Sequence, residues 1–371
     1  MSELYIQSPL NERIRQEIRT AQGAIPFQRF MELALYAPGL GYYEREPKRV
    51  GIDGDFYTSV RVGPLLGELL GSYFGRLSAE LNLPLVLVES GAHDGRLAAD
   101  ILGHLQKWQP QHGPDLWLIE PSKDRRRWQE QTLKEFLPKV HWVHDLDQLA
   151  QSFPDGISGI FYSNELLDAF PVHRLAWSRD RKEWQVFGVA ESSHGFEWRM
   201  LPSDWLPIDS RLYPQIPDDL AEVLPDGFVT EICPMATTWW SSAARLLRVG
   251  RLLTMDYGLE SEEFLAPQRD RGTLRTYLRH QVGDLLLENP GEQDLTAHVD
   301  FDRIQRAGEA NGLTTFFSGS QRLWLTRQME QTLPQVGSAF PAWDSTRVRQ
   351  FQALTHPDHF GRRFRVLEQG K

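Results

Sequence analysis

The clearest chemical signal is an apolar run that ends at Glu89 and leads into a loop with Gly91 and Gly95, followed by the helix-forming segment Arg96–Trp108. Glycines let the backbone turn tightly and let a ligand approach, and the free N–H groups at a helix start face that ligand. This is the strand–loop–helix order of Rossmann-like nucleotide-binding proteins. Because Glu89 would repel a pyrophosphate, the loop favours a ligand with a cationic or hydroxyl-rich end, such as S-adenosylmethionine. A glycine loop that binds nothing is the equally common alternative.

Acidic residues also follow the next two predicted strands. Ligand sites in open parallel sheets lie at the carboxyl ends of the strands, so these acids are candidates for the same site. Glu120 could accept hydrogen bonds from ribose hydroxyls, and its alternative role is that of a surface acid at a strand end. Asp145 could bind the amine of an adenine, or it could cap a helix, a position that aspartate favours.

A third group of polar residues closes the fourth predicted strand, at Asn164, Glu165 and Asp168. Buried acids are costly without partners, so this group favours a cationic or hydrogen-bonding guest. The alternative is a helix cap at Asn164. Further along the chain, His298 stands between acidic residues and could accept a proton, although a single loop histidine is more often structural.

The elements that position these residues alternate between strand and helix from about residue 84 to residue 258. Such alternation predicts an α/β fold with a parallel, Rossmann-like sheet. The predicted strands are 85–89, 116–120, 140–143, 159–163 and 251–256, and the predicted helices are 96–108, 123–137 and 237–247.

Other segments flank or interrupt this alternation. Residues 1–36 read as two amphipathic helices, and 65–81 and 320–333 as further helices. The tryptophan-rich region 174–230 contains two antiparallel strands and is interpreted as an insertion or strand extension against the sheet, serving packing or forming a substrate-facing wall. We therefore expect a helical N-terminal lobe and lid (1–82), a cofactor-binding core with a β-rich insertion (83–258), and a C-terminal segment that completes the sheet and the active-site wall (259–371).

Composition narrows the class of protein. The 371 residues are 41% hydrophobic and 24% charged, which is typical of a globular chain. The net charge of -10 argues against general nucleic-acid binding. Cys233 is the single cysteine, so the chain has no intrachain disulfide and no cysteine-built zinc site, and we expect no metal. No apolar run has the length of a membrane span, and the acidic N-terminus lacks the features of a secretory or transit signal, so we expect a cytoplasmic protein.

Several longer segments are distinctive, and together they resemble the MidA-like family of class I S-adenosylmethionine-dependent methyltransferases over about residues 20–320. Mitochondrial members of that family help assemble respiratory complex I by methylating an arginine of a partner subunit. In the family the loop usually reads E-x-G-P-G-x-G, whereas Ala92 and His93 replace the proline and the middle glycine here, and Val60 replaces a common proline. The side chain of His93 should crowd the approach of a ligand. The segments that carry the resemblance are Arg29–Tyr43, Gly54–Ser59, Gly67-Glu68, the glycine loop, Asn164–Val172, Asn289–Glu292 and Asp294–Phe301.

The resemblance implies a class I methyltransferase sheet with a helical N-terminal lobe, S-adenosylmethionine as cofactor and a protein arginine as methyl acceptor. Arginine stays protonated, so carboxylates must hold its guanidinium. A homodimer is compatible with this expectation. A small-molecule methyltransferase and a non-catalytic assembly factor that keeps the fold are the alternatives. The expected catalytic residues are Glu165, Asp168, His298 and, in support, Asp55; the expected cofactor-binding residues are Thr58, Glu89, Gly91, His93, Gly95, Glu120, Asp145 and Asn164.

Overall fold

The computed structural model describes residues 8–44, 59–82, 86–108, 113–202, 209–278, 281–332 and 344–371. The chain forms two compact units, each assembled from three stretches of sequence. Unit 1 comprises Met1–Tyr57, Asp168–Thr237 and Leu259–Asp300, and unit 2 comprises Thr58–Leu167, Thr238–Gly258 and Phe301–Lys371.

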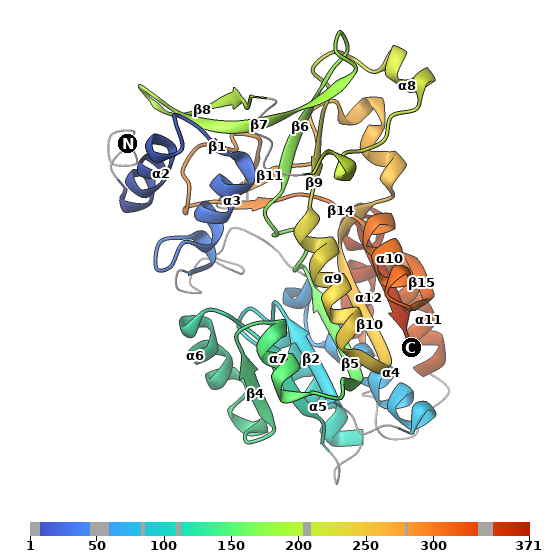
Figure 1. The fold of residues 1–371 in the computed structure, drawn as a ribbon. Coiled ribbons are helices and arrows are strands. Elements are labelled where there is room, and N and C mark those ends of the chain that lie inside the picture. The colour runs from blue at the N-terminus through green and yellow to red at the C-terminus, as the bar shows by residue number, and fades with distance from the viewer. Residues whose placement is uncertain are drawn as a thin grey trace. The chain divides into compact units, whose positions relative to one another are not determined.

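Unit 2 contains the parallel sheet that the alternating pattern predicts. Its strands follow the order β15-β16-β10-β5-β2-β3-β4, in which β16 is antiparallel to both neighbours and the pairs from β10 to β4 are parallel. Figure 1 shows β10 running alongside β5. The strands are β2 (Val86–Ser90), β3 (Asp115–Ile119), β4 (Val140–Val143), β5 (Ile157–Asn164), β10 (Leu247–Leu259), β15 (Thr314–Ser320) and β16 (Phe364–Gly370).

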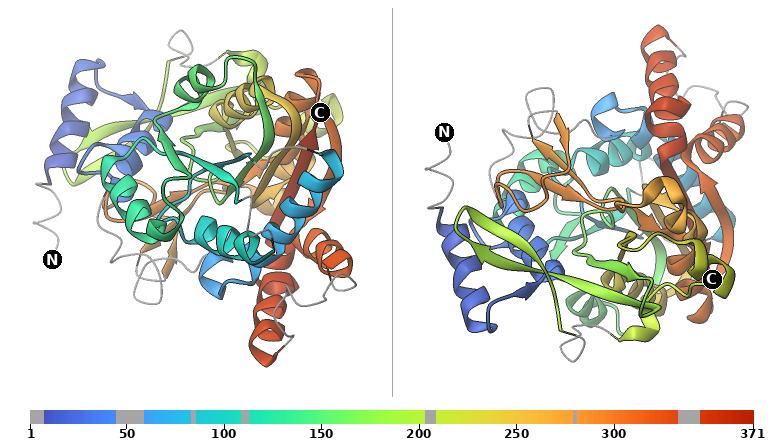
Figure 2. Two further views of the ribbon diagram at one scale, coloured as in Figure 1. Left: turned by 90° about the horizontal axis from the view of Figure 1, so that it is seen from below. Right: turned by 90° about the horizontal axis from the view of Figure 1, so that it is seen from above.

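Helices cover both faces of this sheet. In Figure 2, α4 and α5 lie on one face and α7 and α9 on the other. Apolar side chains of α4 and α5, with Trp324 of α11, form one buried cluster with the sheet residues Leu87 and Tyr162. The helices are α4 (Leu65–Leu81), α5 (Arg96–Trp108), α6 (Lys123–Thr132), α7 (Leu146–Ser152), α9 (Pro234–Leu246, which begins in unit 1), α10 (Phe301–Ala310), α11 (Gln321–Thr332) and α12 (Ser345–Thr355), with short turns η3 (Ser59–Val62) and η4 (Lys134–Phe136).

Unit 1 combines helices with antiparallel sheets. Strands β1, β7, β6 and β9 form one sheet, β8 pairs with β7, and β12, β11 and β13 form another. Buried side chains of α2 and α3, among them Ile14 and Phe30, form one cluster with Val189 of β7. The elements are α2 (Pro9–Thr20), α3 (Phe27–Tyr36), α8 (Asp218–Val223), β1 (Ile25–Pro26), β6 (His173–Ser178), β7 (Glu183–Ser192), β8 (Gly195–Met200), β9 (Val229–Ile232), β11 (Arg275–Leu278), β12 (Gln281–Gly283), β13 (Asp294–Thr296) and β14 (Val299–Asp300).

Most predicted elements lie where the sequence placed them, and two differ. The helix expected over 123–137 ends at Thr132 and continues as η4, because Leu133 turns into the core and the residue before Pro138 is extended. The tryptophan-rich region is not an extension of the parallel sheet. Its strands β6 and β7 pair with each other, with Trp177 opposite Trp184, and with β1, β8 and β9 of unit 1.

The two compact units interleave along the sequence, and the expected functional division into 1–82, 83–258 and 259–371 stays a prediction. The units interleave because strands from distant parts of the chain pair with each other. β16 near the C-terminus pairs with β10 in unit 2, while β1 near the N-terminus pairs with β7 in unit 1.

Candidate functional site

The glycine loop joins β2 to α5 in unit 2, and three of its residues adopt left-handed backbone conformations. Gly91 has φ +79° and Gly95 has φ +82°, values that glycine adopts without strain. His93 has φ +48°, which is uncommon for a residue with a side chain. The tight turn that the two glycines were expected to make is therefore present.

Asp94 ties the loop to the start of α5. Its Oδ1 accepts the backbone N–H of Arg96 at 3.2 Å, and its Oδ2 lies 3.2 Å from the guanidinium of Arg61. Burial alone would raise the pKa of Asp94, but the His93 ring, Arg61 and the Arg96 N–H outweigh burial and lower this pKa to about 2. Asp94 is therefore ionised at neutral pH and anchors the loop.

Glu89 is a buried acid at the carboxyl end of β2. Its side chain is 2% exposed, and Oε2 accepts a hydrogen bond from the Tyr162 hydroxyl at 3.0 Å. Burial raises the pKa of Glu89 to about 8. No basic side chain among the described residues forms an ion pair with this carboxyl. A buried acid without a positive partner suits a cationic ligand, because a nearby opposite charge favours the ionised form.

Glu120 lies just beyond the carboxyl end of β3, and it is buried rather than a surface acid, with 2% exposure. Its Oε1 accepts the N–H of Ser122 at 3.0 Å, and its Oε2 accepts from the Gln129 amide at 3.0 Å. The same amide nitrogen lies 3.0 Å from the carbonyl of His93. An ionised carboxylate has about four acceptor positions, so Glu120 retains capacity for ligand hydroxyls. Gln129 therefore links Glu120 directly to the glycine loop.

Asp145 serves as the N-cap of α7. Its Oδ1 accepts the N–H of Gln148 at 2.8 Å, and its Oδ2 lies 3.0 Å from the His144 ring. The hydrogen bond from Gln148 is the main cause of the lowered pKa of Asp145. The capping role that the sequence left open is thus present, and the side chain is 53% exposed. Binding of an adenine amine by Asp145 stays a prediction.

Asn164 and Glu165 at the end of β5 form a compact polar group with Ser59 of η3. Glu165 Oε1 accepts hydrogen bonds from the Ser59 N–H at 3.1 Å, the Ser59 hydroxyl at 2.8 Å and the Asn164 amide at 2.9 Å. Glu165 itself has φ +53°, and its N–H donates to the carbonyl of Met255 at 3.0 Å. This backbone kink at the strand end, together with three donors, fixes the carboxylate.

The neighbouring strand supports this kink through Asp256. The side chain of Asp256 is fully buried, and Oδ2 accepts the N–H groups of Leu166 at 3.1 Å and Leu167 at 2.8 Å. Its Oδ1 accepts the N–H of Tyr257 at 2.8 Å. Asp256 thus orders the backbone that follows Glu165.

The remaining expected catalytic residues are in unit 1 or outside the described residues. Asp168 is 3% exposed, and its carbonyl accepts the N–H of Ala297 at 2.9 Å, which brings the segments of Asp168 and His298 together. The backbone N–H of His298 donates to the Thr273 hydroxyl at 3.1 Å. Asp55 and Thr58 lie outside the described residues.

Sequence reasoning missed Ser59, Gln129 and Asp256 as parts of this site. Ser59 is fully buried, as is Gln129. The sequence did contain an indication that Asp256 belongs to the site, because Asp256 ends the fifth predicted strand. Gln129 had none, because it stands in a polar helix in which nothing distinguishes it from its neighbours. Among the described residues, no group of three or more His, Cys, Asp and Glu side chains could hold a metal ion.

The parallel sheet, with its glycine loop and acids at the strand ends, is that of a class I methyltransferase. A family model described as "Putative S-adenosyl-L-methionine-dependent methyltransferase" matches residues 69–318, and the chain belongs to this family. The MidA-like resemblance is thereby confirmed, as are the α/β fold class and S-adenosylmethionine as the cofactor. The buried Glu89, which has no basic partner in the part of the chain that the structure describes, and the tight turns at Gly91 and Gly95 fit this cationic cofactor.

Solved structures agree with this assignment. A protein from Burkholderia thailandensis bound to S-adenosyl-homocysteine has a TM-score of 0.81 and 27% identity, covering 98% of this chain and 92% of that chain. A native structure from the same organism has a TM-score of 0.79 and 28% identity, covering 98% and 91%.

Curated relatives are similar over nearly the whole chain. The mitochondrial protein arginine methyltransferase NDUFAF7 homolog of Drosophila melanogaster is 29% identical over 96% of this chain and 84% of its own length. The mitochondrial protein arginine methyltransferase NDUFAF7 of Danio rerio is 26% identical over 97% of this chain and 87% of its own length.

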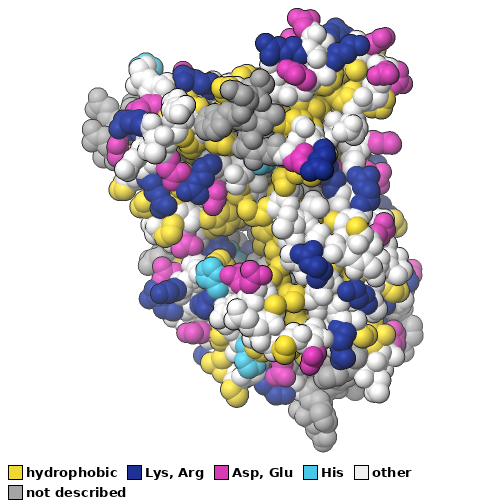
Figure 3. Space-filling model, viewed as in Figure 1, with side chains coloured by type: hydrophobic (Ala, Val, Ile, Leu, Met, Phe, Trp, Pro, Cys, Tyr) yellow, Lys and Arg dark blue, Asp and Glu magenta, His cyan; other side chains and the backbone are white. Residues whose placement is uncertain are grey.

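The mitochondrial names of these relatives contradict the cytoplasmic location expected from the sequence. That expectation rested on the acidic N-terminus, which is not a sound guide to the destination of the protein. In the described parts of the chain, no helix combines the length and apolar character needed to cross a membrane. Acidic and basic side chains are interspersed on the face seen in Figure 3. Homodimer formation and the absence of nucleic-acid binding stay predictions.

Proposed function

We propose that this methyltransferase transfers a methyl group from S-adenosylmethionine to a nitrogen of a protein arginine side chain. The observation that carries the proposal is the half-buried Glu165 carboxylate, which Ser59 and Asn164 hold at the carboxyl end of β5. A fixed carboxylate suits a guanidinium, because the two groups form charge-assisted hydrogen bonds. The names of the relatives, which are protein arginine methyltransferases, support the same acceptor.

The cofactor supplies an electrophilic methyl group on a sulfonium. In transfer, the sulfur–methyl bond breaks, a nitrogen–methyl bond forms, S-adenosyl-homocysteine leaves, and the acceptor nitrogen loses a proton. Glu165 orients the guanidinium and stabilises its charge, an alignment that can lower the barrier by several kcal/mol. Asp168 and His298 of unit 1 are the proposed further catalytic groups, with His298 as the proton acceptor and Asp55 in support.

For the cofactor, Glu89 would face its positive charge and Glu120 its ribose hydroxyls. Gly91, His93 and Gly95 would line the path by which the cofactor approaches the loop. Thr58, Asp145 and Asn164 complete the proposed set of contacts.

The replacement Glu165→Gln tests the proposed acceptor role. Glutamine keeps an oxygen that can accept from Ser59 and Asn164, so we expect a folded protein that binds S-adenosylmethionine almost as the wild type does. Loss of the charge should reduce methyl transfer at least 100-fold, as removal of one transition-state contact commonly does. Calorimetry measures binding, and radiolabel from the methyl group measures transfer into protein, with methylarginine identified by mass spectrometry.

Glu330→Gln is the matched control, because Glu330 is an exposed glutamate on α11. It should leave both binding and transfer unchanged. Normal transfer by Glu165→Gln would contradict the role of Glu165. Label that enters extractable small molecules instead of protein would favour the small-molecule alternative, and cofactor binding without transfer to any fraction would favour an assembly factor.

A further inference from the structure

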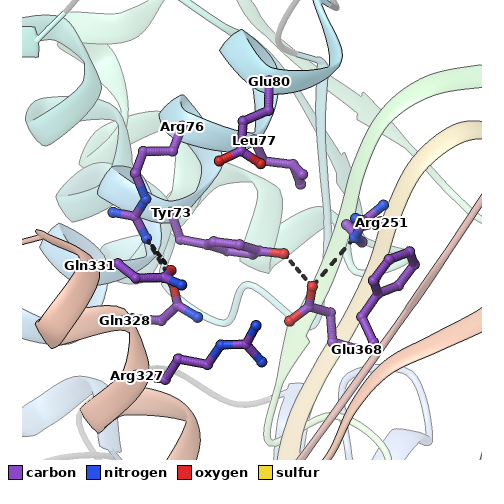
Figure 4. A pocket seen from close by; sticks show the side chains of 10 residues that line it. Tyr73, Arg76, Leu77, Glu80, Arg251, Arg327, Gln328, Gln331 and Glu368 are labelled. Atoms are coloured by element: carbon purple, nitrogen blue, oxygen red, sulfur yellow. Dashed lines mark hydrogen bonds and ion pairs between the residues drawn. The ribbon is translucent and has the colours of Figure 1, made fainter.

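Unit 2 contains a cavity of about 160 Å³ between α4, α11 and the edge of the sheet formed by β10, β15 and β16. Figure 4 shows Arg76 on one side of the cavity and Arg251 on the other, with Tyr73 and Arg327 between them. Its size is well below the roughly 300 Å³ of a pocket for a drug-sized ligand, so it suits a small ion or one group of a larger ligand. The lining residues are Tyr73, Arg76, Leu77, Glu80, Arg251, Phe316, Arg327, Gln328, Gln331 and Glu368.

The charge of Arg76 is buried but is bonded only to neutral acceptors. The residue is 9% exposed, and its guanidinium donates to Thr332 Oγ1 at 2.9 Å, Gln328 Oε1 at 2.8 Å and Gln331 Oε1 at 3.4 Å. Burial lowers the pKa of Arg76, although the charge of Glu80 opposes this shift. Among the described residues no carboxylate forms an ion pair with Arg76. A buried charge without a directly paired opposite charge is costly, so an anion would stabilise it.

The other charges of the lining leave a positive excess. Arg327 has no hydrogen bond or ion pair with any described residue. The charge of Arg251 is partly compensated, because its Nε lies 3.3 Å from Glu368 Oε1. Glu368 also accepts from the Tyr73 hydroxyl and, at 3.0 Å, from the Trp324 indole, so it is already well occupied.

Three arginines therefore face two glutamates in a chain whose net charge is -10. Gln328 and Gln331 add to the donors, because their carbonyl oxygens bind Arg76 and no described residue accepts a hydrogen bond from their NH₂ groups.

The cavity is separate from the cofactor loop. On β10, Arg251 pairs with Ile160 of β5, whereas Met255 pairs with Asn164 at the carboxyl end. Four residues along a strand span roughly 13 Å. A ligand in the cavity would therefore lie toward the amino ends of the parallel strands, away from the expected cofactor.

We infer that this cavity binds a phosphate group, either as a free phosphate or as part of a lipid headgroup. Arginine forks match phosphate oxygens bidentately, and the negative charge of a phosphate would offset the excess of one positive charge that the protein leaves there. The site uses none of the residues proposed for methyl transfer, so it is independent of that function.

Titration with inorganic phosphate, against chloride at matched ionic strength, tests the inference by calorimetry and thermal unfolding. Wild type should bind phosphate and unfold at a higher temperature in its presence. Arg327→Gln should weaken phosphate binding about tenfold, the effect of removing one charge-assisted contact. Arg322→Gln, which changes another exposed arginine of the same helix that does not line the cavity, should bind phosphate as the wild type does.

A second arm distinguishes the two sources of phosphate. Phosphatidylcholine vesicles with and without phosphatidic acid are compared for binding of wild type and Arg327→Gln. Binding to acidic vesicles that depends on Arg327, without binding of free phosphate, assigns a lipid headgroup, and the reverse assigns a free phosphate. Absence of both, or equal effects of Arg327→Gln and Arg322→Gln, would overturn the inference.

Discussion

Burial shifts the pKa of the Glu89 carboxyl far from its usual value. This carboxyl has a hydrogen bond from Tyr162 and no basic partner among the described residues, and burial raises its pKa to about 8. The native protein therefore keeps a proton on Glu89 at neutral pH, whereas the unfolded chain releases it near pH 4.5.

The stability of the protein without cofactor should consequently fall as pH rises from about 4.5 to about 8. The native state binds more protons in this window, so the free energy of unfolding decreases by up to about 1.4 kcal/mol per pH unit. Glu89→Gln should remove this part of the slope while retaining an acceptor for Tyr162. Urea unfolding at pH 5, 6, 7 and 8 measures the effect, with Glu330→Gln as control. The same slope in Glu89→Gln and wild type would show that Glu89 does not titrate in this window.

Glu120 and Asp145 are both acids that follow predicted strands in the sequence, but their environments in the structure differ. Glu120 is 2% exposed and is held by Ser122 and Gln129, whereas the side chain of Asp145 is 53% exposed and caps α7. The difference arises from what packs against each strand end, which residue type does not reveal.

The junction between β5 and β10 depends on one buried carboxylate. In Asp256→Asn, the NH₂ group of the new amide takes the place of one of the two carboxylate oxygens. In one orientation the N–H groups of Leu166 and Leu167 lose their acceptor, and in the other the N–H of Tyr257 loses its acceptor. Buried N–H groups without acceptors are costly, so we expect a loss of about 2–4 kcal/mol in the free energy of unfolding. Urea unfolding followed by tryptophan fluorescence measures this loss. Asp155→Asn, at an exposed position in the turn before β5, should change stability by less than about 0.5 kcal/mol. A similarly small effect of Asp256→Asn would mean that the junction tolerates the change.

The loop between β2 and α5 offers a test of His93. In the native state, His93→Gly removes the strain of the left-handed backbone, which is about 1 kcal/mol or more. Glycine also has more conformational freedom in the unfolded chain, and this largely cancels the gain. The free energy of unfolding should therefore be nearly unchanged. Because the side chain no longer crowds the ligand, we expect tighter binding of S-adenosylmethionine, measured by calorimetry. Gln22→Gly relieves the same backbone conformation in unit 1 and should not alter cofactor affinity. Weaker binding by His93→Gly would indicate that the imidazole contacts the cofactor.

For the molecule as a whole, cofactor binding should stabilise the fold. A ligand that binds only the native state at 100 times its dissociation constant adds about 2.7 kcal/mol to the free energy of unfolding. We expect S-adenosylmethionine to produce such a gain in wild type, measured by urea unfolding at fixed pH. ATP, which shares the adenosine but carries negative charge, is the control and should have a much smaller effect. Failure of S-adenosylmethionine to stabilise the protein would argue that this chain retains the fold without a working cofactor site.

Periodicity and strand–helix alternation were enough to predict the parallel sheet, with helices such as Leu65–Leu81 and Arg96–Trp108 at the observed bounds. These features depend on contacts close in sequence. The acids at the strand ends could also be predicted as a set, because parallel strands end at one edge of a sheet.

Which strands share a sheet, and which polar groups meet, was decided only by tertiary structure. β16 joins β10 from more than 100 residues away, and β7 pairs with β1 rather than extending the parallel sheet. Gln129, Ser59 and Asp256 gain their roles from burial beside Glu120, Glu165 and the end of β5. Long-range pairing and burial depend on which distant surfaces fit together, and local spacing carries no information about that fit.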